Sequence, residues 1–334
     1  ALKGSLVHAG GQVRLDLSLI STSDGKVTAR TTLTGPGDDI NALTDSASWA
    51  LLRAGWKGGF TAPPSLTEVT TRSLDALRAY LRGDQFSVRG EWDEAEAAYA
   101  DAVKADTSFL LAYLGYNRAR GWQLKGVDTA ISHRIDRNID RLPEREAFIR
   151  RAELTSITNP FAADSLFREA TRRWPEWWPA WFWYGDRMLH NGGLDGHSRD
   201  EAMQAFQHAV ELNPGLVPAY HHLVWSAEPI RRDIAQRALA TLDSLDPHSE
   251  FVPLQHVTHE AMEQVPVSGA LVDSAEAVVR NLEGQFVPLA PTLFGWMPDL
   301  QLQVNDRIAR IDPSRAAASA QGDAALWAAR GRWD

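Results

Sequence analysis

Cysteine is missing from the 334-residue sequence. Disulfide bonds, thiolate zinc sites and thiol nucleophiles are therefore excluded. Long apolar runs are missing too, because none approaches the roughly 18 residues that a membrane-spanning helix needs. The net charge of −9, with Lys and Arg scattered among acidic residues, leaves no basic stripe that could neutralise phosphates. We therefore expect neither a transmembrane segment nor a nucleic-acid partner.

Motifs for catalysis and for metal binding are also absent. The sequence has no G-x-S-x-G, and TGPGDD lacks the spacing of a phosphate-binding loop. HVTHE, which holds His256, His259 and Glu260, is neither H-E-x-x-H nor its inversion. The paired carboxylates of Asp38 and Asp39 stand at a predicted helix start, where the helix dipole explains them. We expect a non-enzymatic protein with no catalytic residues, no metal and no cofactor.

The first feature that the chain does contain is a run of strand patterns. GQVRLDLSLI and KVTARTTL alternate apolar and polar residues, SDGK between them is a turn, and GSLVHAGG predicts a third strand. A helix ending at Gly55 follows, with the apolar stripe Ile40, Leu43, Ala47, Ala50 and Leu51. Residues 1–62 are thus predicted to form a small α+β unit with a thin core. Because the chain starts on Ala1 within a strand pattern, we expect an upstream signal peptide, anchor or further domain.

Helical periodicity dominates from Leu66 onward, and four segments share one spacing. In each, a small residue is followed by a large side chain at offset 4, a small or apolar one at offset 7 and a helix-ending position at offset 12. The small residue lets two helices approach, and the large one fills the gap one turn later. The four sets are Ala95, Tyr99, Ala102 and Thr107; Ala163, Phe167, Ala170 and Pro175; Ala202, Phe206, Ala209 and Pro214; and Ala235, Leu239, Leu242 and Pro247.

The helix before the third set carries Trp181, Tyr184, Gly185 and Met188 at matching intervals. Together these residues resemble the tetratricopeptide repeat, whose first helix carries W-x2-L-G-x2-Y and whose second helix carries A-x3-F…P. The resemblance covers residues 76 to about 247. It implies a mainly α protein, with a tetratricopeptide-like α-solenoid over residues 63–250 after the small α+β unit. Residues 251–334 are then C-terminal helices and a docking tail.

A second resemblance covers more of the chain. The order of strand pair, helix, TEVTTRSLDALRAYLRGD, GEWDEAEAAYADAVKADTSFLLAY, DRLPERE and AFQHAVELNPGLVPAY is similar to the repeat-bearing, non-catalytic C-terminal regions of bacterial membrane-tethered Ser/Thr kinases and related regulators. None of the kinase's own motifs is present, neither the Gly-rich loop nor H-R-D nor D-F-G. The resemblance therefore implies a regulatory or docking role and a periplasmic location, without chemistry.

Tryptophan is unusually abundant, with 13 copies against 11 Phe and 6 Tyr. Trp181 occupies the core position of the repeat, but its neighbours in RRWPEWWPAWFWYGDRM cannot all share one face of a helix. An indole has a large apolar body and an N–H that requires an acceptor, which suits protein interfaces and membrane-interface belts. We predict contacts with a partner or with the membrane interface at Trp174, Trp177, Trp178, Trp183, Trp296, Trp327 and Trp333.

The repeat geometry predicts another surface, a concave groove lined by the first helix of each repeat. Such grooves bind extended or helical segments of partner proteins. Of the adjacent His221 and His222, we expect one to face this groove and the other to face water. The predicted groove residues are Tyr80, Asp84, Leu114, Arg118, Trp122, Phe182, Asp186, His190, His221 and Trp225.

These features predict an interaction scaffold, an extrinsic subunit that docks on or stabilises a larger protein assembly. The tryptophan surplus favours subunits of a membrane-bound complex, respiratory or photosynthetic, as partners. The expected location is the periplasm or another extracytoplasmic membrane face, with the cytoplasm left open. The alternative is the sensory or regulatory region of a bacterial Ser/Thr kinase or transcription regulator. A third interpretation is an enzyme whose site the motifs do not reveal.

Overall fold

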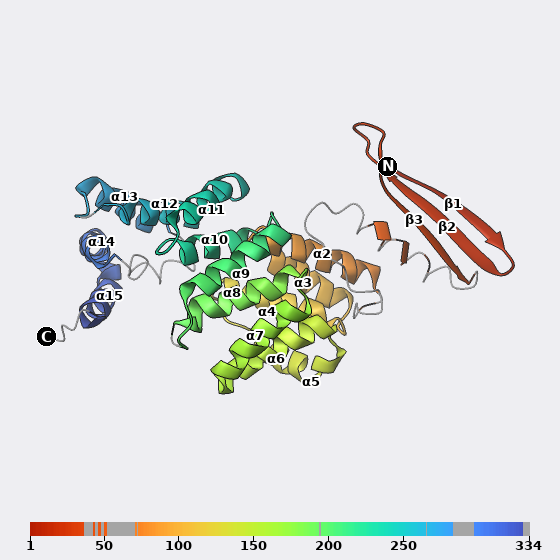
Figure 1. Cartoon of the computed structure of the whole chain (residues 1–334), viewed down its shortest axis with the longest axis horizontal. Coiled ribbons are helices and arrows are strands. Elements are labelled where there is room, and N and C mark those ends of the chain that lie inside the picture. Colours follow the sequence, from red (N-terminus) through yellow and green to blue (C-terminus); the bar gives the residue numbers. More distant parts are fainter. Residues whose placement is uncertain are drawn as a thin grey trace.

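The computed structural model describes residues 1–36, 43, 46–47, 50–51, 71, 73–193, 195–264, 266–282 and 297–329. It begins with an antiparallel sheet of three strands in the order β1-β2-β3. The strands are β1 (Leu2–Ala9), β2 (Gln12–Ile20) and β3 (Val27–Pro36). Figure 1 shows the sheet at one end of the molecule. The three strands expected from the alternating pattern are confirmed.

The sheet has little core of its own. Val13 is buried on β2, whereas β1 is exposed along its whole length. Leu43, from the predicted helix, is buried and packs over Gly35, where an added Cβ would stand 2.5 Å from the Leu43 Cδ1 atom. Ala47 is buried as well. The remainder of that predicted helix, Ile40 included, lies largely outside the described residues.

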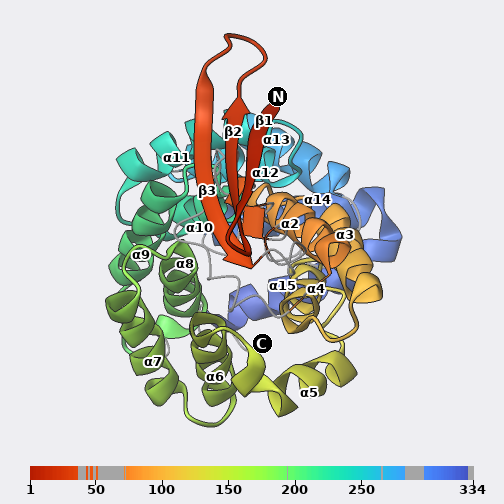
Figure 2. The same ribbon diagram turned by 90° about the vertical axis from the view of Figure 1, so that its right-hand side faces the viewer.

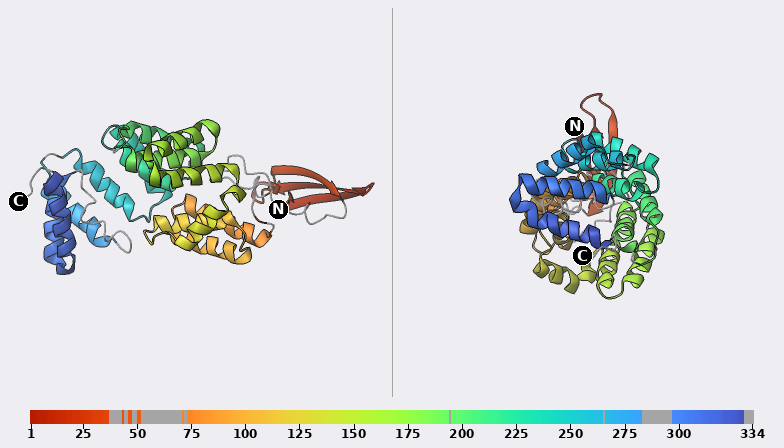
Figure 3. Two further views of the ribbon diagram at one scale, coloured as in Figure 1. Left: turned by 90° about the horizontal axis from the view of Figure 1, so that it is seen from below. Right: turned by 90° about the vertical axis from the view of Figure 1, so that its left-hand side faces the viewer.

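Antiparallel pairs of helices make up most of the described chain. Figures 2 and 3 show these pairs winding around a common axis, and in Figure 2 α8 and α10 lie closer to that axis than α9 and α11. The first helices of the pairs are α2 (Leu74–Val88), α4 (Leu110–Trp122), α6 (Glu144–Thr158), α8 (Trp178–Arg187), α10 (Val217–Ala227) and α12 (Phe251–Ala261). Their partners are α3 (Trp92–Ala105), α5 (Thr129–Arg137), α7 (Pro160–Arg173), α9 (Arg199–Leu212), α11 (Arg232–Leu245) and α13 (Gly269–Asn281).

The residues at the shared spacing of the second helices are the ones that pack between helices in this stack. All residues at offsets 0, 4 and 7 of the four sets, from Ala95 to Leu242, are buried. In two of the four sets the large side chain at offset 4 fills the space left by a glycine on a first helix. The ring of Tyr99 lies against Gly83 and Gly115, and the ring of Phe206 lies against Gly185. Small and large residues therefore alternate across these interfaces, as the repeat pattern predicts.

Helices continue beyond Pro247, where the sequence spacing fades. α12 and α13 pack with α14 (Pro298–Ile311) around a separate apolar cluster that includes Leu271 and Leu300. α15 (Ala316–Ala329), the expected tail helix, packs on α14. Within the described part of the chain, no helix combines the length and the hydropathy that crossing a membrane requires.

Candidate functional site

The concave side of the helical stack forms a groove of about 1170 Å³, which we call the inner groove. Its walls come from α4, α6, α8 and α10, with contributions from the start of α3, from α5 and from the segment between α11 and α12. Seven of the ten predicted groove residues line it, namely Leu114, Arg118, Trp122, Asp186, His190, His221 and Trp225. The face of the first helices that was expected to be concave therefore lines the inner groove.

Three predicted groove residues lie elsewhere. Phe182 is buried, because its ring packs against Trp122 and Phe206 at centroid distances of 6.0 and 5.9 Å. It belongs to the core where α8 meets α9 and α10. Tyr80 and Asp84 lie on α2, whose described residues do not line the groove.

Two further tryptophans, Trp92 and Trp183, line the inner groove without having been assigned to it from the sequence. Trp92 stacks on Trp122, with ring centroids 4.9 Å apart and ring planes 5° apart. Trp183, predicted to contact a partner or the membrane interface, has its ring 4.6 Å from the guanidinium carbon of Arg118. Trp183 precedes Asp186 by three residues on α8, and this spacing was the signal that could have placed both on one face.

Exposed apolar side chains lie among these rings. Leu124, Val127 and Ile157 have 56, 53 and 79% of their surface exposed, and all three line the inner groove. Single exposed apolar residues are ordinary on protein surfaces, but here they share one concavity with four tryptophans. The groove therefore presents apolar surface that a bound segment would remove from water.

The inner groove is acidic. Arg118 donates hydrogen bonds to Glu146 and Glu153, and Arg150 donates to Asp136 and Glu153. These two arginines are the groove-lining cations among the described residues, and both are already bonded to carboxylates. The potential in the groove is therefore negative. The carboxylates that line it are Glu91, Asp93, Glu94, Asp136, Glu153, Asp186, Asp246 and Glu250.

Asp84 has a perturbed carboxyl group between α2 and α3. Its Oδ1 accepts a hydrogen bond of 2.7 Å from the Tyr99 hydroxyl. Burial raises the pKa of Asp84 to about 7; the Glu146 carboxylate adds to the increase, while hydrogen bonds from Tyr99 and Tyr80 and the charge of Arg118 oppose it. Asp84 is therefore about half protonated near neutral pH.

We predict that Asp84→Asn raises the free energy of unfolding near pH 8 and leaves it almost unchanged near pH 4. A carboxyl group whose pKa is raised on folding contributes stability below its unfolded pKa of 3.8 and loses it as the pH rises through about 7. Asparagine keeps an acceptor for Tyr99 without a charge to bury. Because Asp84 is only partly buried, we expect a gain of about 2 kcal/mol at the higher pH.

Urea unfolding between these two pH values measures this difference. Asp101→Asn on α3 is the matched control, since the Asp101 side chain is 66% exposed and should give little change at either pH. If the difference in stability between Asp84→Asn and wild type stays constant from pH 4 to pH 8, the pKa of Asp84 is not raised.

Asp186, His190 and His222 meet on one wall of the groove. Asp186 is on α8, His190 is on the π-helical segment Met188–Gly192 that continues it, and His222 comes from α10. The His222 Nε2 atom lies 3.4 Å from His190 Nε2 and 3.6 Å from Asp186 Oδ1, and the latter two atoms are 3.5 Å apart. Burial lowers the pKa of His222 to about 3, so its imidazole is neutral at physiological pH. Burial also raises the pKa of Asp186.

The adjacent histidines are placed differently from expectation. His221 and His222 both line the inner groove, and neither is left to water. His222 is the buried one, while the His221 ring nitrogens lie 2.9 Å from Gln255 Oε1 and 3.3 Å from Asp246 Oδ2. The reason is that α12 of the next pair covers the side of α10 that an isolated helix would expose.

Trp174 and Trp177 lie outside the groove, in the turn between α7 and α8. Their rings meet edge to face at 6.1 Å, and Arg173 and Arg145 lie over them at 4.7 and 5.9 Å. Both indoles are partly buried, and so is Trp178 at the start of α8. This segment, which we call the outer turn, is an aromatic surface that holds two of the predicted contact residues.

Trp181, expected in the core, is only partly buried. Its Nε1 donates to the Pro175 carbonyl oxygen at 2.8 Å, and its ring lies 4.4 Å from that of His208. These contacts hold the indole at the edge of the interface between α8 and α9. Among the other predicted contact residues, Trp327 is partly buried on α15. Trp296 and Trp333 lie outside the described residues.

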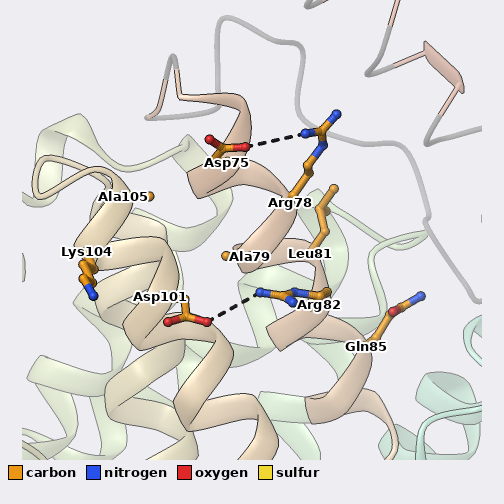
Figure 4. Close-up of a pocket in the computed structure, with 9 residues that line it drawn as sticks. All are labelled: Asp75, Arg78, Ala79, Leu81, Arg82, Gln85, Asp101, Lys104 and Ala105. Atoms are coloured by element: carbon orange, nitrogen blue, oxygen red, sulfur yellow. Dashed lines mark ion pairs between the residues drawn. The ribbon is translucent and has the colours of Figure 1, made fainter.

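A second depression, of about 810 Å³, lies between α2 and α3 (Figure 4). Arg78 pairs with Asp75 at 3.5 Å and Arg82 pairs with Asp101 at 3.6 Å, and all four side chains are largely exposed. Exposed ion pairs of this kind contribute about 0–1 kcal/mol and are typical of solvated surface. The inner groove is therefore the stronger candidate.

No protein-family model and no curated protein matches this sequence. Among solved structures, the chain is similar to one from the APC/C hetero-tetramer Cut9–Hcn1, with 16% identity and a TM-score of 0.51 over 75% of this chain. The chain spans about half of that protein's length, 49%. Yeast Tom70 matches at 14% identity and a TM-score of 0.40, over 87% of this chain and 66% of its own. A tetratricopeptide repeat protein from Parabacteroides merdae matches at 13% identity and a TM-score of 0.37, over 74 and 98% of the two chains.

The likeness to the Cut9–Hcn1 structure and the helix packing confirm the predicted fold class. The chain is a tetratricopeptide-like α-solenoid preceded by a small unit with an antiparallel sheet.

Proposed function

We propose that this chain is a non-enzymatic interaction scaffold whose inner groove binds an apolar, basic segment of a partner protein. The observation that carries the proposal is the acidic groove of about 1170 Å³ lined with tryptophan. A concave surface along stacked helical pairs suits an extended or helical segment, whose alternate side chains enter the groove.

The chemistry of the groove supports a cationic, apolar occupant. Trp92, Trp122, Trp183 and Trp225 supply rigid anchors for aliphatic side chains and for the stems of Lys and Arg. The carboxylates outnumber the guanidiniums, and the guanidiniums are already paired, so the negative potential favours a basic segment and disfavours an acidic one.

We predict that Trp183→Ala weakens binding of such a segment by about tenfold or more, the effect expected from removing a buried aromatic anchor. The probe is a fluorescein-labelled amphipathic Leu/Lys peptide, followed by fluorescence anisotropy. A Leu/Glu peptide of the same pattern should bind far more weakly, because it meets like charges. Trp177→Ala, in the outer turn, is the matched control and should bind the Leu/Lys peptide as wild type does. Equal binding of both peptides, or equal losses in the two variants, would count against the groove.

We further propose that the partner belongs to a membrane-bound assembly at an extracytoplasmic face, on which this chain docks as an extrinsic subunit. The outer turn supports this, because Trp174 and Trp177 lie beside Arg173 and Arg145 there. Indoles and basic side chains are typical of membrane-interface surfaces. Mild detergent extraction followed by identification of co-purifying subunits tests the proposal, and a chain that elutes alone speaks against it.

The alternative is that this chain is the sensory or regulatory region of a bacterial Ser/Thr kinase or transcription regulator. The order of sequence segments supports it, and the inner groove would serve it equally well. The gene sequence upstream of Ala1 distinguishes the two proposals, because a kinase or DNA-binding domain encoded there would favour the alternative.

A further inference from the structure

We propose that Asp186, His190 and His222 form a binding site for one divalent transition-metal ion, zinc in the first instance, on the wall of the inner groove. Three donor atoms converge there, Asp186 Oδ1 and the Nε2 atoms of the two histidines. They form a nearly equilateral triangle with sides of 3.4, 3.5 and 3.6 Å. The site is independent of whether the groove binds a peptide.

The triangle has the size of one face of a coordination tetrahedron. Zinc bonds to imidazole nitrogen and carboxylate oxygen are about 2.0–2.2 Å long, so tetrahedral donor atoms stand about 3.3–3.6 Å apart. An ion about 2.1 Å from each of the three atoms would lie roughly 0.6 Å out of their plane. The side chains therefore already have the spacing that the ion requires.

The donor set also selects the class of ion. Imidazole suits zinc, copper, iron and nickel, whereas calcium and magnesium require mainly oxygen ligands. Two histidines and one carboxylate, with one position left open, is a ligand set found in zinc sites that accept a further ligand. Here the position left open would face the groove.

The other ring nitrogen of His222 prepares it as a ligand. His222 Nδ1 lies 2.8 Å from the Pro218 carbonyl oxygen. Because a carbonyl only accepts, the Nδ1 atom carries the proton and Nε2 directs its lone pair toward Asp186 and His190. Metal-binding histidines are usually supported by such a hydrogen bond from the nitrogen that does not bind the ion.

An apolar wall closes the inner side of the site. The rings of Trp122, Phe182, Phe206 and Trp225 surround His222 at centroid distances of 5.2, 5.9, 5.2 and 5.6 Å. They fix the orientation of the imidazole and keep water from its buried side. The His190 side chain, in contrast, is 52% exposed, so an ion can enter from the groove.

The backbone at His190 and the charges around the three side chains also support a metal site. His190 lies in the π-helical turn Met188–Gly192, and single π turns within helices occur frequently at functional sites. The Glu153 carboxylate on α6 acts on Asp186 and adds negative charge near the triangle. A bound cation would offset the repulsion between these carboxylates.

Isothermal titration calorimetry of the full chain with ZnCl₂, after treatment with a chelator, tests the site. We expect one zinc ion to bind per chain. His190→Ala removes an exposed ligand and should lower the affinity by more than about 100-fold, since the loss of a ligand's supporting hydrogen bond alone costs about 10–100-fold. His256→Ala is the matched control, because it removes an exposed histidine that pairs with Asp243 at 2.8 Å away from the triangle.

Cobalt substitution reports the geometry. Tetrahedral Co²⁺ absorbs visible light more strongly than hydrated Co²⁺, so wild type and His256→Ala should develop this band while Asp186→Asn and His190→Ala do not. Wild type without stoichiometric zinc binding, or His190→Ala with wild-type affinity, would overturn the metal site. Binding of the Leu/Lys peptide to the metal-free chain would be unaffected by that failure, so the two proposals are separately testable.

Discussion

Replacing Asp164 by alanine is expected to lower the free energy of unfolding by about 3 kcal/mol, because it leaves a buried guanidinium without its main counter-charge. Asp164 on α7 accepts a hydrogen bond of 2.6 Å from the Arg187 Nε atom on α8. The Arg187 and Asp164 side chains are 9 and 4% exposed. Removal of one partner of such a pair costs about 3–5 kcal/mol. Arg187 retains a contact with Asp195, which holds the loss near the lower end of that range.

Urea unfolding at neutral pH measures the loss, and Asp233→Ala is the matched control. Asp233 pairs with Arg231 at 2.9 Å, but both side chains are about half exposed, so its removal should cost less than about 1 kcal/mol. The triple variant Asp164→Leu/Arg187→Met/Asp195→Asn should regain much of the stability, because it removes the buried guanidinium together with both of its carboxylate partners. If Asp164→Ala and Asp233→Ala lose similar amounts of unfolding free energy, burial is not what makes the Asp164–Arg187 pair costly to break.

Gly115→Ala is expected to destabilise the protein by about 1–3 kcal/mol, although Gly→Ala within a helix usually stabilises it. A Cβ at position 115 would stand 2.5–2.8 Å from three atoms of the Tyr99 ring. The ring has little room to retreat, because the same ring atoms also pack against α2, where a Cβ at Gly83 would stand 2.6 Å from the nearest of them. Gly115 is therefore needed for the close approach of α4 to its neighbours.

Gly121→Ala in the same helix is the control for this prediction. Its Cβ would meet only the Val127 Cγ1 atom, at 3.9 Å, so this variant should gain up to about 1 kcal/mol from helix propensity. Thermal and urea unfolding of both variants should thus give changes of opposite sign. Stabilisation by Gly115→Ala would mean that Tyr99 is not held as tightly as its contacts indicate.

Much of the fold could be predicted because its determinants are local in the chain. In α9, Ala202, Phe206 and Ala209 lie on one stripe at helical spacing, and all three are buried. The glycine that receives the Phe206 ring is one helix earlier, so the interface between neighbouring helices depends on a short stretch of sequence. The same locality explains why seven of the ten residues expected along the concave face line the inner groove.

The errors concern residues whose surroundings depend on more than one repeat. Phe182 has the spacing of a groove residue, yet α9 and α10 cover it. Trp181 has the position of a core residue, yet its indole nitrogen finds an acceptor in the Pro175 carbonyl at the rim. Helical spacing predicts the face of the helix on which a side chain lies. Whether that face is covered depends on how closely the neighbouring helices pack over it.

By itself the sequence determined that this chain folds into stacked helical pairs behind a small sheet, because each pair is specified by small and large residues a few turns apart. The tertiary structure alone decided that His222 meets His190, 32 residues away, together with Asp186. That meeting depends on how α10 is rotated against α8 and on the π turn that carries His190. Local spacing does not encode a rotation between helices, since it results from the packing of all the side chains between them.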